Sequence, residues 1–352
     1  MSPLSLRQAA GQVLVVGLEG TQLSAVETAW LRLLQPGGVI LFRRNIESPA
    51  QTHALLRSVE GPRLRCIDVE GGTVDRLRDS IAPMPSALAV AATKETAVFQ
   101  QHGALIGEEV SMLGLNVTFA PVLDLRTPES EPVMTSRVVS GDPALAARYA
   151  SFFLKGLKQQ SVLGCGKHFP GLGSGQVDSH HATPVITKPL NLLWSEDLLP
   201  YRKLMKQLPM VMISHASYPT AVAEPASISG YWIREVLIKE MGYQGLIVSD
   251  DMEMGGILKY TGMAEAAIAA IAAGTHIVEI CRDPALIFIA YEALLREAES
   301  SPAFARLLRG AATKVIDLKT KALPPAPTDT AVEKMRTAVE RFREQVVKAG
   351  SA

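Results

Sequence analysis

Short apolar runs alternate with longer stretches of helical periodicity along most of this chain. The runs are continuous rather than alternately apolar and polar, which is typical of strands buried on both faces of a parallel sheet. Eight runs have this character, and they span residues 12–18, 39–42, 64–69, 116–122, 161–165, 210–214, 245–249 and 276–280. Helix-length stretches follow them at residues 23–34, 49–59, 94–113, 143–158, 191–206, 233–241, 264–273 and 284–298.

The repeated order of strand and helix predicts an α/β fold, a single (β/α)8 TIM-type barrel with helices outside a closed parallel sheet. A doubly wound open sheet is the alternative, but no Gly-x-Gly-x-x-Gly follows the first predicted strand. We assign the barrel to residues 1–320. Residues 321–352 are expected to form a C-terminal extension, in which a proline-containing linker at 323–327 leads to a charged helix at 332–347. That helix either packs on the barrel or forms a dimer contact.

The composition of the chain argues against some classes of binding partner. The chain has 352 residues, 47% of them hydrophobic, and its 35 basic and 35 acidic residues give no net charge. No basic excess or basic run points to nucleic acid. No apolar run reaches the length of a membrane span, and the N-terminus lacks a signal core. The three cysteines, Cys66, Cys165 and Cys281, lie in predicted strands without a paired spacing, so buried free thiols and a cytoplasmic location are expected.

Polar residues gather where the predicted strands end. In a parallel barrel the carboxyl ends of the strands share one face, which is where such folds place their sites. The residues at these ends are Asp68, Asp124, Lys167, His168, His215 and Asp250. A random scatter of titratable residues would not collect at one end of several strands, so the sequence predicts a site on this face.

The stretch 167–181 is the densest candidate, with three histidines, a lysine, an aspartate and several glycines. Asp178 and His180 are two residues apart and can meet through a local turn. A carboxylate beside an imidazole fixes its tautomer and raises its pKa, which suits proton transfer. Gly171, Gly173 and Gly175 make loop motion an expectation. The alternative is a polar surface loop whose histidines have no role.

Asp250 and Asp251 form a second candidate at the end of a predicted strand. Because side chains alternate along a strand, one carboxylate should face the barrel axis and the other the outer helices. The inward one needs partners to stay ionised, and Lys167, Arg137 or Arg76 could supply them. It could then act as a nucleophile, whereas one aspartate suffices as a helix N-cap. No ligand pattern typical of a metal accompanies the pair.

Several segments resemble the family 3 glycoside hydrolases, specifically their bacterial β-N-acetylhexosaminidases of cell-wall recycling. The matching segments are VGLEGT (16–21), GGVILFRRNI (37–46), IDVEGGTVDRLR (67–78), NVTFAPVLDL (116–125), the loop of Arg137, GKHFPGLGSGQVDSHHATP (166–184), EPASIS (224–229) and GYQGLIVSDDMEM (242–254). They follow the family's order over about residues 8–300. The Asp-Ser-His of residues 178–180 is the mark of the hexosaminidase branch.

The resemblance implies a retaining, two-step mechanism. Asp250 matches the nucleophile, His180 the general acid/base and Asp178 the partner of His180. Residues that match positions holding sugar hydroxyls are Asp68, Arg76, Arg137, Lys167 and His168. Retaining enzymes usually use two carboxyl groups, and here an imidazole would take the place of one. No cofactor and no metal are implied.

The leading hypothesis is therefore an exo-acting β-N-acetylglucosaminidase that removes terminal N-acetylglucosamine from muropeptides or related glycosides. A phosphorylase on the same scaffold is an alternative, because a histidine acid/base tolerates incoming phosphate better than a carboxylate does. A non-catalytic sugar-binding barrel is the other. Three departures from the family pattern bear on specificity: Leu172 replaces a histidine, His276 replaces an aspartate, and no aspartate occurs at 221–223. The oligomeric state is left open.

Overall fold

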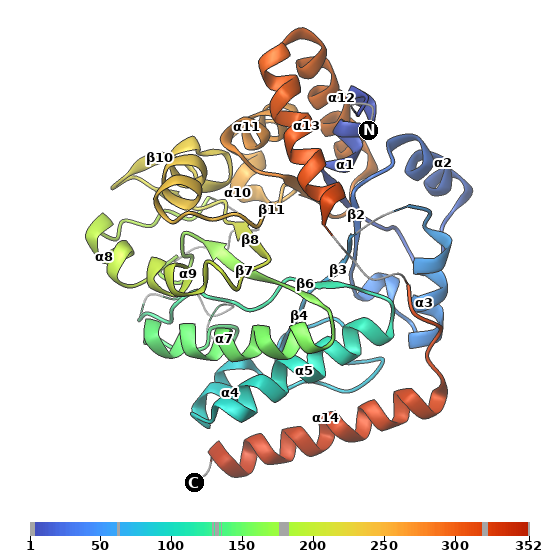
Figure 1. Cartoon of the computed structure of the whole chain (residues 1–352), viewed down its shortest axis with the longest axis vertical. Helices are drawn as coiled ribbons and strands as arrows, with labels where there is room; N and C mark the ends of the chain where they lie inside the picture. The colour runs from blue at the N-terminus through green and yellow to red at the C-terminus, as the bar shows by residue number, and fades with distance from the viewer. Residues whose placement is uncertain are drawn as a thin grey trace.

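The computed structural model describes residues 4–61, 64–128, 130, 134, 136–175, 183–318 and 323–350. Its central element is a closed barrel of eight parallel strands, which confirms the predicted (β/α)8 fold (Figure 1). In chain order the strands are β1 Leu14–Gly17, β2 Gly38–Leu41, β3 Leu64–Ile67, β6 Val117–Thr118, β7 Leu163–Phe169, β8 Met210–Ile213, β11 Leu246–Asp251 and β12 Ile277–Ile280. Around the barrel they follow chain order, and β12 closes the ring against β1.

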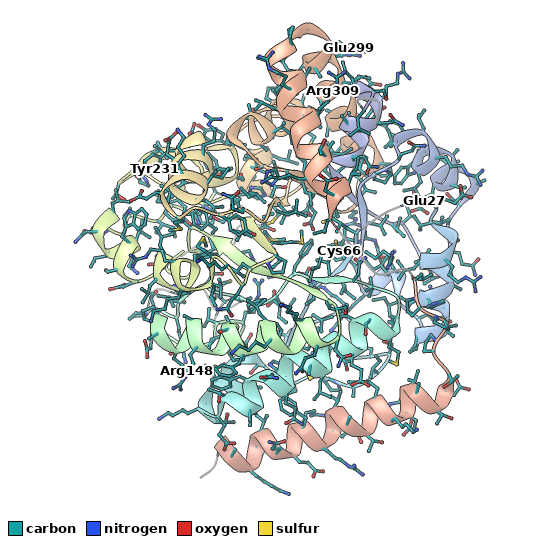
Figure 2. The ribbon with its side chains drawn as sticks, viewed as in Figure 1. Glu27, Cys66, Arg148, Tyr231, Glu299 and Arg309 are labelled. Carbon is teal, nitrogen blue, oxygen red and sulfur yellow. The ribbon has the colours of Figure 1, made fainter. Side chains whose placement is uncertain are left out.

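Each strand is buried on both faces, as its continuous apolar sequence predicts. Residues such as Val15, Met210 and Val248 form one apolar cluster, and their neighbours in the chain, such as Val16 and Val211, belong to a larger second cluster. The alternation of side chains along a strand produces these two layers. The three cysteines are all free and buried, and Cys66 lies at the centre of the molecule (Figure 2).

Helices surround the barrel (Figure 1). Their bounds are α1 Leu6–Gln12, α2 Ala25–Leu34, α3 Pro49–Ser58, α4 Ala87–Ala92, α5 Thr96–Met112, α7 Pro143–Gln159, α8 Leu190–Ser195, α9 Leu198–Leu204, α10 Gly255–Leu258, α11 Met263–Ala273, α12 Pro284–Ser300, α13 Pro302–Asp317 and α14 Asp329–Gly350, with a π-helix η3 at Tyr231–Glu240 and short 3₁₀ turns η1 Arg43–Asn45 and η2 Ala226–Ile228. Several begin with a polar cap followed by proline, as α7 does at Asp142. Proline is pre-organised for that first helical position, so these boundaries were readable from the sequence.

Several parts of the helical layer differ from the prediction. The single helix expected at 191–206 is two helices, α8 and α9. The break falls at Glu196, whose backbone leaves the helical conformation, and the next residue, Asp197, is buried and accepts a 2.5 Å hydrogen bond from Lys188. The short helices α4 and α10 were not predicted. The helices α1 and α13 were not predicted either, and they pack against each other. Ser5 and Gln8 form a capping box that starts α1, a signal that was present in the sequence.

The C-terminal helix α14 lies across α4 and α5 (Figure 1). Its buried residues are Met335, Val339, Phe342 and Val346, spaced along one helix face. Phe342 stacks on the buried His102 ring of α5 with 5.8 Å between ring centroids. Burial lowers the pKa of His102 to about 3, so this ring is neutral. The helix therefore packs on the barrel's helical layer, one of the two roles expected for it; the domain division itself stays a prediction.

Two small hairpins rise from the carboxyl ends of the barrel strands. One consists of β4 Val69–Gly71 and β5 Val74–Asp75, and the other of β9 Ser217–Tyr218 and β10 Val222–Pro225. In the first, the buried Asp75 carboxylate accepts hydrogen bonds from the backbone N–H groups of Leu77 and Met84. These bonds fix the loop that follows the hairpin. Among the described helices, none combines the length and apolar character needed to cross a membrane.

The position of His276 corrects one expectation. This histidine directly precedes β12, so it lies at the amino ends of the strands, opposite the face that carries Asp250. Its Nδ1 accepts a hydrogen bond from the backbone N–H of Ile247, near the start of β11. Burial lowers its pKa to about 3. His276 therefore stabilises the opposite rim as a neutral ring and has no part in a sugar subsite.

We expect Phe342→Ala to lower the free energy of unfolding by about 3 kcal/mol, because it empties a buried aromatic site against His102. Urea denaturation followed by circular dichroism measures this. Arg343→Ala, an exposed neighbour on the same helix, is the control and should change stability by less than about 0.5 kcal/mol. A loss of similar size in both variants would contradict the packing role of Phe342.

Candidate active site

The carboxyl face of the barrel brings most of the predicted site residues together. Asp68 follows β3, Lys167 and His168 lie within β7, and Asp250 lies within β11. Arg76 and Arg137 reach the same place from the loops after β5 and β6. Asp178 and His180 lie outside the described residues, and so does the centre of the loop predicted to move.

Glu70 is the centre of this charged network. Its carboxylate accepts two hydrogen bonds from Arg137, Nε to Oε2 at 2.9 Å and Nη2 to Oε1 at 2.8 Å. Lys167 Nζ lies 2.7 Å from the same Oε1. The Glu70 side chain is only 3% exposed. Burial alone would raise its pKa, but Arg137 and Lys167 bring the pKa well below its usual value, so Glu70 is ionised.

Asp68 extends the network toward solvent. Lys167 Nζ donates to Asp68 Oδ1 at 2.7 Å, and Arg76 Nη2 lies 3.8 Å from Asp68 Oδ2. Although burial opposes the charged form, Asp68 and Glu70 raise the pKa of Lys167 above its usual value. The floor of the site is thus a row of alternating charges that ends in the partly exposed Asp68 and Arg76. Such a row offers donors and acceptors in fixed positions to a ligand rich in hydroxyl groups.

His168 is held by Asp124, which lies after β6. His168 Nδ1 donates to Asp124 Oδ2 at 2.6 Å, and the backbone N–H of Leu172 donates to Asp124 Oδ1 at 2.6 Å. Arg137 Nη2 approaches His168 Nε2 at 3.4 Å. These contacts fix the orientation of the His168 ring. Asp124 therefore holds both the His168 ring and the backbone that follows β7.

Asp250 has different partners from those expected. Burial raises its pKa, but the imidazoles of His168 and His215, the Asp251 N–H and, to a smaller extent, Lys167 together bring it below the usual value. The salt bridges of Lys167, Arg137 and Arg76 run to Asp68 and Glu70 instead. The carboxylates of Asp68 and Glu70 lie closer to these cations than that of Asp250 does, and they form the salt bridges. Asp250 is thus ionised without a salt bridge to any of these three described residues, through the weaker influences named above.

His215, which follows β8, lies beside the backbone that carries Asp250. Its Nε2 donates to the Asp251 carbonyl at 2.9 Å, and its Nδ1 forms a hydrogen bond with the Ser227 hydroxyl at 2.8 Å. Burial lowers the pKa of His215, and the nearby Asp250 charge opposes this shift. Both ring nitrogens are used, which fixes the orientation of His215 and ties β8 to the backbone beside Asp250.

Asp251 has a local structural role. Its Oδ1 accepts hydrogen bonds from the backbone N–H groups of Glu253 and Cys281 at 3.0 and 3.3 Å. Burial, with the nearby Glu253 and Asp250 charges, raises its pKa to about 7. Asp251 thus holds the turn after β11, and the functional role expected of Asp250 stays a prediction.

Sequence reasoning missed Glu70 as a site residue and assigned no role to Asp124 or His215. A signal for Glu70 was available, because residues two apart on an extended chain point to the same side. Asp68 and Glu70 have that spacing and share Lys167. Among the described residues, no group of three or more His, Cys, Asp or Glu side chains is arranged to hold a metal ion.

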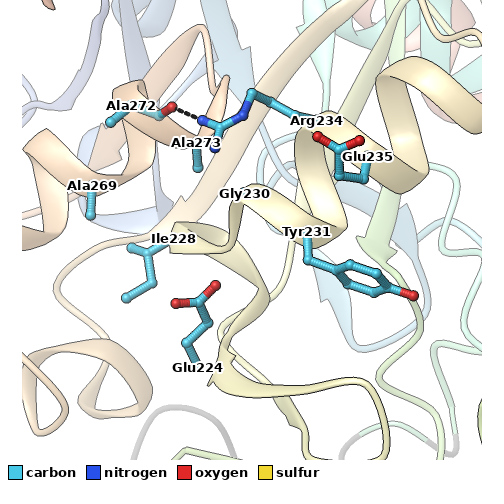
Figure 3. A pocket seen from close by; sticks show the side chains of 9 residues that line it. All are labelled: Glu224, Ile228, Gly230, Tyr231, Arg234, Glu235, Ala269, Ala272 and Ala273. Atoms are coloured by element: carbon cyan, nitrogen blue, oxygen red, sulfur yellow. Dashed lines mark hydrogen bonds between the residues drawn. The ribbon is translucent and has the colours of Figure 1, made fainter.

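A hollow lies between η3 and α11 (Figure 3). It has a volume of about 530 Å³ and is lined by residues such as Glu224, Tyr231 and Arg234. The Arg234 guanidinium donates to the Ala272 carbonyl and spans one side of it. None of its lining residues belongs to the charged network, so the hollow is separate from the candidate site.

Comparisons with known proteins identify the family of this chain. Residues 5–318 match the model of the glycosyl hydrolase family 3 N terminal domain. The chain is 37% identical over 301 residues to a β-hexosaminidase of Pseudomonas aeruginosa, covering 84% of this chain and 90% of that protein. It is 36% identical over 307 residues to a β-hexosaminidase of Bordetella avium, covering 84% and 87% of the two chains.

Solved structures of family 3 enzymes also resemble this chain. A family 3 β-N-acetylglucosaminidase from Paenibacillus sp. FPU-7 superposes with a TM-score of 0.87 and 30% identity, covering 97% of this chain and 69% of that one. NagZ from Neisseria gonorrhoeae, in complex with N-trifluoroacetyl-D-glucosamine, superposes with a TM-score of 0.78 and 26% identity, covering 97% and 98%. The likeness therefore extends over nearly the whole chain.

Asp251 makes stability depend on pH. Its pKa of about 7 in the folded protein exceeds the ordinary 3.8, so the folded protein keeps a proton that the unfolded chain has lost. Wild type should lose stability as pH rises from about 4 to about 7. Asp251→Asn keeps the Oδ1 acceptor and cannot ionise. We expect its melting temperature to equal that of wild type at pH about 4 and to exceed it at pH about 8.

Thermal denaturation monitored across this pH range checks the prediction. Asp283→Asn is the matched control, because Asp283 is an exposed aspartate whose Oδ1 also accepts a backbone N–H, that of Ala285. The control should leave the shape of the pH profile unchanged. Parallel profiles for wild type and Asp251→Asn would show that Asp251 is not the group that titrates.

Proposed function

Because this chain belongs to glycosyl hydrolase family 3 and is a glycoside hydrolase, we propose that it is a retaining exo-β-N-acetylglucosaminidase. Its substrates are glycosides with a terminal β-linked N-acetylglucosamine. The β-N-acetylglucosaminidase of Paenibacillus sp. FPU-7 and the N-trifluoroacetyl-D-glucosamine bound to the Neisseria gonorrhoeae protein support this sugar. Muropeptides are the natural substrate class that the sequence resemblance favours, and the buried free thiols suit a cytoplasmic setting.

One observation carries the proposal: Asp250, an ionised carboxylate at the carboxyl end of β11, faces a fixed row of charged groups. An exposed or salt-bridged carboxylate would be a weaker nucleophile, because water or a cation would hold its lone pairs. A non-catalytic sugar-binding barrel would not need an ionised Asp250 at this position. The charged row beside it suits the hydroxyl groups of a sugar, and Asp68, Arg76, Arg137, Lys167 and His168 are its proposed contacts.

The first chemical step forms a glycosyl-enzyme. The Asp250 carboxylate attacks the anomeric carbon, and the bond from this carbon to the aglycone oxygen breaks. His180, protonated beside Asp178, gives its proton to that oxygen as the bond breaks. The aglycone leaves as a neutral alcohol, Asp250 holds the sugar as an ester, and His180 is left neutral.

The second step releases the sugar. Neutral His180 takes a proton from water while the water oxygen attacks the anomeric carbon, and the ester bond to Asp250 breaks. Asp250 regains its negative charge and His180 its proton, so the enzyme returns to its starting state. Two displacements at the same carbon give net retention of configuration. If phosphate replaced water here, the product would be the 1-phosphate of the sugar, which is the phosphorylase alternative.

We expect Asp250→Ala to lower kcat for 4-nitrophenyl N-acetyl-β-D-glucosaminide by at least about 10³-fold, since it removes the nucleophile. Asp251→Asn is the adjacent control and should stay within about tenfold of wild type.

A 5-fluoro derivative of the sugar should label Asp250, and mass spectrometry of the peptide locates the label. Wild-type activity no greater than that of Asp250→Ala would refute the hydrolase proposal. The product formed with and without phosphate separates the hydrolase from the phosphorylase.

A further inference from the structure

Phe42 lies beside the charged floor of the site. Ile40 of β2 pairs with Cys66 of β3, and both belong to the apolar cluster that has members on all eight barrel strands. Phe42 and Asp68 each come two residues later in the chain. Because side chains alternate along an extended chain, both point toward the barrel axis. The Phe42 ring packs, partly buried, against the same cluster, so it is the apolar neighbour of Asp68.

The backbone at Phe42 is tied to the loop that follows β1. The Phe42 N–H donates to Asn45 Oδ1 at 2.9 Å. Asn45 is fully buried, and its Nδ2 donates to the carbonyls of Leu18 and Gly20 at 3.0 and 2.9 Å. The end of β2 is therefore fixed by hydrogen bonds, and the Phe42 ring starts from a fixed Cα position.

Arg76 reaches the same place with its side-chain donors unused. Its backbone N–H donates to the Asp68 carbonyl at 3.3 Å, which sets where the side chain starts. Its Nη2 lies 3.8 Å from Asp68 Oδ2, which is too far for a hydrogen bond. The nearer partner of Asp68 is Lys167, at 2.7 Å. Within the described part of the chain, the buried Nε of Arg76 has no hydrogen-bond partner.

The Phe42 ring contacts the Arg76 guanidinium. Arg76 Cζ lies 5.7 Å from the ring centroid, and Arg44 Cζ lies 4.8 Å from it. The negative face of an aromatic ring attracts a cation within about 6 Å. Arg44 is also held by hydrogen bonds, from Nε to the Leu18 carbonyl at 2.9 Å and from Nη2 to the Cys281 carbonyl at 2.5 Å. Of the two arginines, Arg76 is therefore the one whose place depends on the ring.

From these contacts we propose that Phe42 is a positioning residue, which holds the Arg76 guanidinium beside Asp68 so that both groups meet the sugar. A hydroxyl group accepts and donates hydrogen bonds, so one sugar hydroxyl can accept from Arg76 and donate to Asp68. A side chain that is already held loses less freedom when the ligand binds. The inference rests on the proposed function and on the sugar contact proposed for Arg76, and it adds a residue that acts through Arg76.

The first test is a double-mutant cycle on kcat/KM for 4-nitrophenyl N-acetyl-β-D-glucosaminide. Phe42→Leu keeps an apolar side chain and removes the ring, and we expect it to lower kcat/KM about fivefold. Arg76→Met keeps an unbranched stem and removes the guanidinium, and it should lower kcat/KM at least about tenfold. In the Arg76→Met background, Phe42→Leu should cost less than about twofold, because no guanidinium at position 76 is left to hold.

The second test weakens the ring's negative face and keeps its shape. Fluorine atoms on an aromatic ring withdraw electron density from its face, so they weaken the attraction for a cation. We expect 3,4,5-trifluorophenylalanine at position 42 to lower kcat/KM by about as much as Phe42→Leu does, and 4-fluorophenylalanine to give an intermediate value. This substitution also keeps the inference testable if thermal denaturation shows that Phe42→Leu does not fold.

Phe152→Leu is the matched control. Phe152 is another partly buried phenylalanine with a cation near its ring, Lys155 Nζ at 4.2 Å from the centroid, but it lies on α7 outside the charged network. Removing its ring should change kcat/KM by less than about twofold. The control separates the loss of a cation–aromatic contact in general from the loss of the one beside Asp68.

An equal loss from Phe42→Leu with and without Arg76 would overturn the inference, because the ring would then act by packing alone. Wild-type kinetics in Phe42→Leu, or no response to fluorination, would overturn it as well. Unchanged kcat/KM in Arg76→Met would remove Arg76 from the sugar contacts, and the inference with it. The proposed function fails by a different result, namely equal activity of wild type and Asp250→Ala, so the two are tested separately.

Discussion

A buried negative charge, that of Glu70, is the constraint on which the site depends. A carboxylate that is 3% exposed cannot stay ionised without close cations, and removing either partner would leave an uncompensated charge in the interior. Its cations come from different parts of the chain: Arg137 from the loop before α7 and Lys167 from β7. Three segments must therefore be in place together, so the geometry of the floor is set during folding and does not wait for a ligand.

The same constraint explains the state of Asp250. Lys167 is committed to Asp68 and Glu70, both at 2.7 Å, and it contributes to Asp250 only from farther away. Asp250 keeps its charge through two imidazoles and a backbone amide. A direct salt bridge would hold the carboxylate in place, whereas these weaker contacts leave it ionised, as the nucleophile role that we propose for Asp250 requires. The strong ion pairs of Glu70 and Asp68 with Lys167 and Arg137 thus leave Asp250 without such a salt bridge among the described residues.

Much of this architecture could be predicted from the sequence because it depends on local pattern. Continuous apolar strands and proline-started helices gave the barrel, and strand ends gave the face that carries Asp68, Lys167 and Asp250. Pairing between distant segments could not be predicted in this way. Nothing in the sequence says that Arg137 and Lys167 neutralise Glu70 rather than Asp250, since that depends on distances across the barrel.

The contacts of Leu172 and His276 show how these two departures from the family pattern affect the site. Asp124 binds the backbone N–H of Leu172, which any residue but proline would supply, so the loss of a histidine side chain there leaves this contact intact. The Leu172 side chain is itself buried in the apolar core. His276 lies at the opposite rim and uses its ring to bond Ile247. Neither change touches the ionised groups of the floor. A substitution within a motif changes the site only where the side chain makes the contact. At position 172 the contact with Asp124 is made by the backbone N–H, so replacing the side chain does not remove it.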